Sequence, residues 1–159
     1  MPVPLFAAGE KPSAAKLQQL ANEDTYTPTL TASTSNPTLG TGAQQFSRIW
    51  LNGQHVTIWA YVRFGTSASA GSGTYRLSIP AAYPLDPNFN NFPVGSVRLL
   101  DNSTSNQESG TLVADIDTGT FLIQHDNDGD FVSNSNPWTW ADLDNILFIA
   151  SYLTDFGSS

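Results

Sequence analysis

The sequence predicts an all-β fold, a jelly-roll-like β-sandwich with one short N-terminal helix. Charged residues make up only 13% of the 159 residues, whereas hydrophobic residues make up 40%. Short runs of alternating apolar and polar residues are separated by turns of glycine, proline, asparagine and serine, which is typical of sandwiches and jelly rolls. A chain of this length fits one domain. We expect residues 1–25 to form an N-terminal segment with the helix, and residues 26–159 to form the sandwich domain.

The predicted helix lies between Ser13 and Asn22. Ala14, Leu17 and Ala21 recur at helical spacing, and Ser13 can cap the first turn. A helix of about ten residues is marginal on its own, because helix nucleation is costly, so it needs a partner surface. The same three residues match the seam of a coiled coil, which predicts a contact between subunits. Docking on its own domain is the alternative.

The clearest pair of strands surrounds Asn52-Gly53, a dipeptide that suits the type I′ turn of a β-hairpin. One face of the second strand is apolar and is predicted to be core; it carries Val56, Ile58, Ala60, Val62 and Phe64. The opposite face carries Trp59 and Tyr61 among polar residues. We therefore expect these two aromatic side chains to contact something outside the sheet, such as a second subunit.

Further strands are expected wherever apolar and polar residues alternate. They are residues 26–34, 36–40, 74–80, 95–103 and 146–153, together with a hairpin over 111–125 that turns at Thr118-Gly119. The stretch 81–93 contains three prolines, so it is predicted to be a long surface loop and not a central strand.

The charge of the chain excludes one class of partner. The net charge is −8, and no lysine or arginine follows Arg98. Such a chain would repel a phosphate backbone, so nucleic acid is not expected as a partner. There is no cysteine and no run of about 18 apolar residues, so neither disulfides nor membrane insertion are expected. The start of the chain lacks the features of a signal peptide.

An acidic stretch offers a weak candidate for a metal site. Asp126, Asp128 and Asp130 alternate with Asn and Gly, and their carboxylates could bind a hard cation. An EF-hand loop would require Gly and Glu where this chain has Phe131 and Pro137. A tight acidic turn between strands explains the same residues. We therefore expect no metal and no cofactor.

The candidates for catalysis are few. Asp115 and Asp117 lie on one face of a predicted strand, at a spacing that glycosidase carboxylates can have, but nothing around them suggests the apolar pocket that a general acid needs. His55 and His125 are the only imidazoles, and the chain has no nucleophile elbow. The sequence therefore predicts a protein that is not an enzyme.

Trp138 and Trp140 are the candidates for a ligand or receptor contact. They lie two residues apart and so share one face of an extended segment. Flat aromatic rings can stack on sugars, which makes these two residues candidates for binding a glycan. Packing in the core or in an interface is the alternative, and it is favoured.

Five strings in the sequence resemble, in their order along the chain, small β-rich modules of the minor tail proteins and tail fibres of tailed bacteriophages that infect actinobacteria. The strings are AGEKPSAAKLQQL, YTPTLTASTSNPTLGTG, GSGTYRLSIP, FPVGSVRLLDNS and NPWTWADLDNIL. Each is weak alone, but together they span most of the chain. Residues 126–130 and the ending SYLTDFGSS depart from the pattern, and the resemblance brings no active-site motif with it.

The resemblance implies a virion protein of the phage tail, assembled in the host cytoplasm, with a jelly-roll-like domain that forms a homotrimer and contacts other phage tail proteins. Its implied function is structural, with a part in host-cell attachment and receptor binding. The alternative is a glycan-binding module that recognises the host cell envelope through exposed aromatic residues and loops such as 66–73. A third interpretation is a polysaccharide-degrading enzyme that uses Asp115, Asp117 or residues 126–130.

Overall fold

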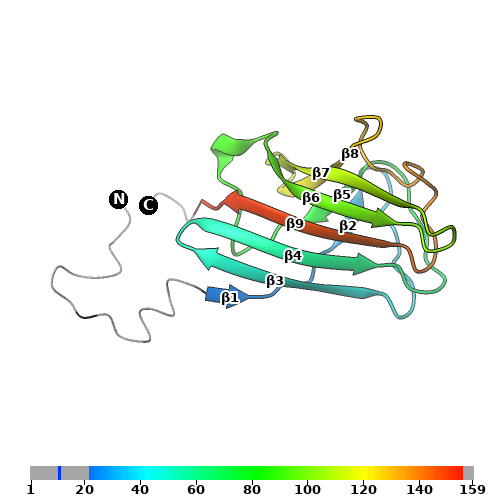
Figure 1. Ribbon diagram of the computed structural model, residues 1–159, viewed down its shortest axis with the longest axis horizontal. Helices are drawn as coiled ribbons and strands as arrows, with labels where there is room; N and C mark the ends of the chain where they lie inside the picture. Colours follow the sequence, from blue (N-terminus) through cyan, green and yellow to red (C-terminus); the bar gives the residue numbers. More distant parts are fainter. Residues whose placement is uncertain (1–10, 12–21, 156–159) are drawn as a thin grey trace.

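The computed structural model describes Lys11 and residues 22–155, and these residues form nine strands and one short 3-10 turn (Figure 1). The strands are β1 (Asn22–Asp24), β2 (Leu30–Ala32), β3 (Gln44–Asn52), β4 (His55–Arg63), β5 (Tyr75–Ser78), β6 (Pro93–Leu100), β7 (Gln107–Asp115), β8 (Thr120–His125) and β9 (Asn145–Leu153), and the turn is η1 (Pro87–Phe89). Within this part of the chain, no helix is long and apolar enough to cross a membrane.

All nine strands belong to one antiparallel sheet. Their order across the sheet is β1-β3-β4-β9-β6-β7-β8-β5-β2. The sheet curls into a half-barrel, so that β5 and β2, at one end of the strand order, lie behind front strands such as β6 and β9 in Figure 1. The apolar core lies inside this curl, between the two parts of the sheet that face each other.

The prediction of an all-β fold is confirmed, but the two-sheet sandwich or jelly roll is not. Alternation along a strand shows that one of its faces is buried, but it does not show which strands share a sheet. Here the opposing layers belong to one continuous sheet. The predicted helix, with Ala14, Leu17 and Ala21, lies outside the described residues, except that Asn22 begins β1.

The hairpin at Asn52-Gly53 is confirmed. β3 and β4 pair from Gln44 opposite Arg63 to Asn52 opposite His55, and Gly53 has a φ of +61°. The face of β4 predicted to be core is buried throughout, and its members Val56, Ile58, Val62 and Phe64 are fully inaccessible. The opposite face of β4 points outward.

The chain between β1 and β2 fastens the two ends of the curled sheet. The hydroxyl of Ser47 in β3 donates to the carbonyl of Tyr26 at 2.7 Å and accepts from its N–H at 2.9 Å. The phenol of Tyr26 then donates to the carbonyl of Ser78 in β5 at 3.0 Å. Because β3 and β5 are each next to an edge strand, these bonds hold the half-barrel in its curled form. The region predicted as a strand over 26–34 is regular only in β2.

Two long connections cover one end of the half-barrel. Residues 33–43 and 64–74 run antiparallel and pair through isolated bridges, among them Thr38 with Ser69 and Thr41 with Thr66. The carboxylate of Asp142 accepts from the backbone N–H groups of Ser67 and Ala68 at 3.1 and 2.8 Å. The loop 66–73, named above as a candidate for glycan recognition, is therefore paired along its backbone with residues 35–41.

A buried carboxylate fixes the start of β9. Asp144 is fully buried and accepts from the backbone N–H groups of Ala141 and Asn102, both at 2.9 Å. Burial raises the pKa of this carboxyl, and the nearby Asp101 carboxylate raises it further, while the two backbone bonds act in the opposite direction. Asp144 thus joins the β6–β7 turn to the segment that leads into β9.

A glycine lets β6 lie close to β9. The register of β6 against β7 shifts between Pro93 and Gly95, which marks a bulge. A Cβ atom added to Gly95 would lie 1.9 Å from the carbonyl oxygen of Ile149 in β9. Only glycine therefore allows this strand pair to form at its observed spacing.

We predict that Gly95→Ala destabilises the fold by about 1 to 3 kcal/mol, because the added methyl group forces β6 away from β9. Urea denaturation followed by circular dichroism measures this change. Ser96→Ala is the matched control, since Ser96 is exposed on the next position of the same strand, and its effect should stay within about 0.5 kcal/mol. Equal stabilities for the two variants would contradict the prediction.

Candidate functional site

The outward side of β3, β4 and β9 carries a group of large apolar side chains. We define the aromatic face by its six members, Phe46, Trp50, Trp59, Tyr61, Leu147 and Ile149. Phe46 and Trp59 are the most exposed of them, at 58% and 56%. Because side chains alternate along a strand, the burial of Ile58, Ala60 and Phe148 in the core forces their neighbours outward.

The strand register aligns these side chains in rows across the sheet. Phe46 lies opposite Tyr61, which lies opposite Leu147. In the next row, Trp59 lies opposite Ile149. Ring contacts within the face join Phe46 to Tyr61, with centroids 5.0 Å apart, and Trp50 to Trp59 at 5.7 Å. The face is therefore one contiguous surface and not a set of isolated exposed residues.

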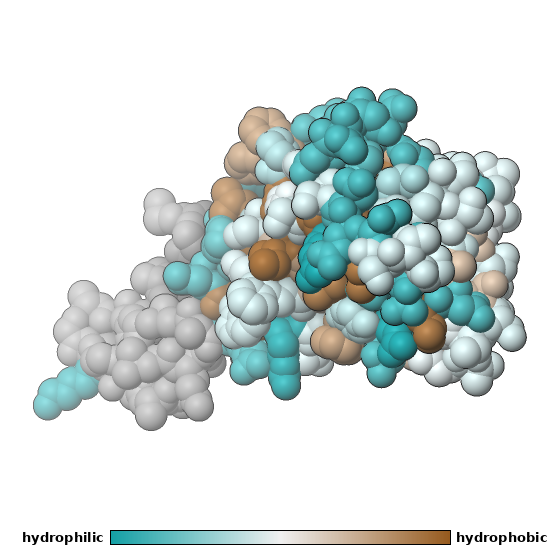
Figure 2. Space-filling model, turned by 45° about the vertical axis from the view of Figure 1, so that its right-hand side comes forward, coloured by the Kyte–Doolittle hydropathy of each residue, from teal (hydrophilic) through white to brown (hydrophobic). Residues whose placement is uncertain are grey.

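A shallow groove of about 680 Å³ combines the aromatic face with a polar side. The rows continue onto β6 and β7: Leu147 lies opposite Arg98, and Ile149 lies opposite Ser96. The polar side of the groove is formed by Ser96, Arg98, Ser109, Thr111 and Asp126. In the view of Figure 2, the surface is mostly white and teal, with smaller brown apolar patches among them.

Basic residues are concentrated on this side of the sheet. Arg48, Arg63 and Arg98 occupy outward positions of β3, β4 and β6, and the chain has only one other arginine, Arg76. Arg48 pairs with Glu23 at 3.2 Å. The Nε of Arg98 donates to the Gln107 side chain at 3.1 Å. Within residues 22–155, no carboxylate forms an ion pair with Arg63 or Arg98.

Trp138 and Trp140, the predicted ligand contacts, do not belong to this face. Trp140 is only 3% exposed, and its ring lies 5.8 Å from that of Phe64 and 5.7 Å from that of Tyr75. Its indole N–H donates to the carbonyl of Ser133 at 3.0 Å. Trp138 is half-buried against Trp140. These contacts correspond to the packing alternative and leave Trp140 inaccessible to a ligand.

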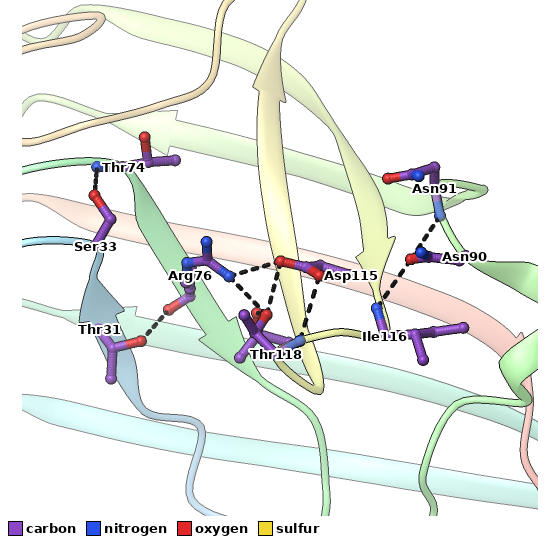
Figure 3. A network of polar contacts seen from close by, with 10 residues as sticks. Thr31, Ser33, Thr74, Arg76, Asn90, Asn91, Asp115, Ile116 and Thr118 are labelled. Atoms are coloured by element: carbon purple, nitrogen blue, oxygen red, sulfur yellow. Dashed lines mark hydrogen bonds and ion pairs between the residues drawn. The ribbon is translucent and has the colours of Figure 1, made fainter.

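Asp115 and Asp117 have different surroundings and do not act as a matched pair. Figure 3 shows Asp115, Arg76 and Thr118 pointing toward one another beside the β7–β8 turn, with Arg76 at 2.6 Å from the Asp115 carboxylate. Partial burial acts to raise the pKa of Asp115, but hydrogen bonds from Thr118 and Arg76 outweigh it and lower the pKa. Asp117 is exposed. A general acid of a glycosidase needs the opposite shift.

We predict that Asp115 contributes to stability at neutral pH and that this contribution is lost in acid. Because its pKa is lower in the folded state, the contribution is present above the unfolded value of about 4 and disappears as the pH falls through the folded value. Asp115→Asn should reduce stability by about 1 to 3 kcal/mol at pH 7 and should flatten the fall in stability that occurs as the pH drops below about 4. Denaturation at several pH values measures both effects.

Asp117→Asn is the control for that experiment, because Asp117 is exposed two positions along the chain. Its unfolding free energy should match that of the unchanged protein within about 0.5 kcal/mol at each pH. Identical pH profiles for the Asp115→Asn variant and the unchanged protein would show that the ion pair does not stabilise the fold.

The acidic residues 126–130 form a tight turn. Asp128 accepts from the backbone N–H of Asp130 at 2.9 Å and from the Nδ1 of His125 at 3.1 Å. The hydroxyl of Thr111 donates to Asp126 at 3.3 Å. Among the residues that the structure describes, no three His, Cys, Asp or Glu side chains are grouped so that they could hold a metal ion. The carboxylates of Asp126 and Asp128 thus have separate partners within the protein.

The sequence indicated only part of the aromatic face. Trp59 and Tyr61 point outward as predicted. Leu147 and Ile149 went unnoticed because β9 is apolar at almost every position, which is typical of a strand buried on both sides. The lack of alternation in β9 could have indicated exposed apolar side chains, because an antiparallel strand with one solvated side should alternate between apolar and polar residues. The contact between Phe46 and Tyr61 depends on the register of the hairpin.

Comparison with known proteins assigns the chain to no family. No protein-family model matches it, and neither a curated protein nor a solved structure is significantly similar to it. The fold and the face therefore define the protein only as a class: an all-β chain that presents an aromatic and arginine-bearing sheet face.

Proposed function

We propose that this chain is a structural and attachment module of a bacteriophage tail, and that the aromatic face is its contact surface. The exposed aromatic face is the observation that carries the proposed binding role. The resemblance of the five sequence strings to phage tail modules supplies the phage context. Homotrimeric assembly and kinship with jelly-roll-like tail domains belong to the same proposal and rest on that resemblance.

The composition of the face supports a binding role. Surfaces that bind a macromolecule are enriched in Trp, Tyr, Phe and Arg and depleted in Lys, Glu and Asp. The outward positions of β3, β4 and β9 carry four aromatic residues and two arginines, and no lysine or acidic residue. Single exposed apolar residues are ordinary, whereas a contiguous group of six is typical of an interaction site.

The position of the face in the sheet supports the same role. Its side chains stand on β3, β4 and β9, and all three of these strands have hydrogen-bonded neighbours on both sides. Side chains held on such strands lose little conformational freedom when a partner binds, because the backbone is already fixed. The face is therefore preorganised for contact.

The oligomeric part of the proposal predicts a stable trimer. Light scattering at micromolar concentration should give three times the mass of one chain. A monomer that persists at the highest concentration tested would remove the homotrimer from the proposal. The attachment role would then rest on the aromatic face of a single chain.

We predict that Trp59→Ala weakens binding to actinobacterial cell envelopes by at least about tenfold, because truncation of a central aromatic contact commonly costs about 2 kcal/mol or more. Sedimentation of the chain with purified envelopes measures this binding. Phe92→Ala is the matched control: Phe92 is 52% exposed and lies outside the groove. Circular dichroism should show that both variants retain the fold.

The proposed role of the face would be wrong if Trp59→Ala and Phe92→Ala bound envelopes equally well. The attachment role itself would be wrong if the unchanged protein bound no envelope in a panel of actinobacterial hosts.

A further inference from the structure

We propose that the groove binds an anionic polysaccharide, whose sugar rings contact the aromatic face and whose carboxylate or phosphate groups bind Arg98. This inference rests on the proposed attachment function and names the chemical class of its ligand. It places the sugar site on the outer side of β3, β4, β9 and β6, and not at Trp138 and Trp140.

The two sides of the groove differ in chemistry. Its side on β3, β4 and β9 is apolar and aromatic, whereas its side on β6 and β7 carries the hydroxyls of Ser96, Ser109 and Thr111 and the guanidinium of Arg98. A sugar ring is itself two-sided, because its C–H groups form apolar patches and its hydroxyls project at the edges. Apolar and hydrogen-bonding groups side by side in one groove match that pattern.

The extent of the groove suits a chain and not a single sugar. One register row runs from Phe46 through Tyr61, Leu147 and Arg98 to Ser109. Four strand spacings of about 4.8 Å give this row a length of about 19 Å. Several linked sugar rings can therefore lie along it, with one end over the aromatic residues and the other beside Arg98.

The charge of the face indicates that the ligand is anionic. The chain carries a net charge of −8, yet three of its four arginines share this side of the sheet, and two of them, Arg48 and Arg98, line the groove. The groove lining also includes one carboxylate, that of Asp126, which accepts a hydrogen bond from the hydroxyl of Thr111. Glu23 neutralises Arg48 only, and Arg98 is held by the neutral side chain of Gln107. A guanidinium with no carboxylate partner, next to exposed aromatic rings, is well suited to bind a carboxylate or phosphate of a ligand.

The same charges argue against a second copy of the face as its occupant. In an interface with two-fold symmetry, the same patch of each subunit meets its counterpart. The two patches that carry Arg48, Arg63 and Arg98 would then lie against each other. Within residues 22–155, Glu23 is the one acidic residue that forms an ion pair with any of these three arginines. Like charges brought together in an interface are costly.

Two matched pairs of polymers test the ligand class. Oligogalacturonate is compared with its methyl ester, which keeps the sugar rings and loses the carboxylate charge, and phosphomannan is compared with neutral mannan. Polyglutamate serves as a polyanion without sugar rings. Titration calorimetry on the full chain at two salt concentrations measures each affinity, and the two pairs distinguish carboxylate from phosphate as the bound group.

The inference predicts that at least one anionic polysaccharide binds, and that its neutral counterpart and polyglutamate each bind at least about tenfold more weakly. Trp59→Ala and Arg98→Gln should each weaken binding by about tenfold or more. Phe92→Ala and Gln54→Glu are the controls and should change affinity by less than about twofold. Gln54→Glu changes the net charge by the same amount as Arg98→Gln, at an exposed turn outside the groove.

Equal binding of the neutral polymers, equal binding of polyglutamate, or no binding of any polysaccharide would each overturn the inference. An oligomer that dissociates when Trp59 is replaced would also overturn it, because the face would then be an interface between copies. Envelope binding that depends on Trp59 but is not competed by either anionic polysaccharide would leave the attachment function in place and reject this ligand class alone.

Discussion

The structure depends on the burial of one face of a single sheet against another part of the same sheet. Because side chains alternate along each strand, this burial also determines which side chains point outward. Ile58 and Ala60 must point into the core, so Trp59 must point outward. The outer side of β3, β4 and β9 has no second layer above it among the described residues. The aromatic face is thus a direct consequence of how the core is made.

Polar contacts add to the apolar core in closing the curl. Tyr26 connects β3 to β5 through three hydrogen bonds, and the carboxylate of Asp142 holds the loop at Ser67 and Ala68. These contacts lie away from the aromatic face. The closing contacts and the exposed face are therefore made by different residues, so single substitutions on the face can alter binding while the curl is retained.

Local features of the fold could be predicted from the sequence, and long-range ones could not. The turn at Gly53 and the two faces of β4 follow from residue type and alternation. The pairing of β4 with β9 joins residues about 90 positions apart in sequence. No pattern within a short stretch of the sequence indicates that these two strands pair. The polar side of the groove, with Arg98 beside Leu147, exists only because of that pairing and the pairing of β9 with β6. For Trp140 the sequence left both a ligand contact and packing open, with packing favoured, and the structure buries its ring in the core.

Hydroxyl-radical footprinting with mass spectrometry tests most directly whether the aromatic face is the binding surface. Oxidation is measured at the exposed residues Phe46, Trp59, Phe92 and Phe131, with and without purified actinobacterial cell-wall polysaccharide. The account predicts that the polysaccharide protects Phe46 and Trp59 and leaves Phe92 and Phe131 as reactive as before. Protection of Phe92 or Phe131 in place of Phe46 and Trp59, or no protection at any of the four, would contradict it.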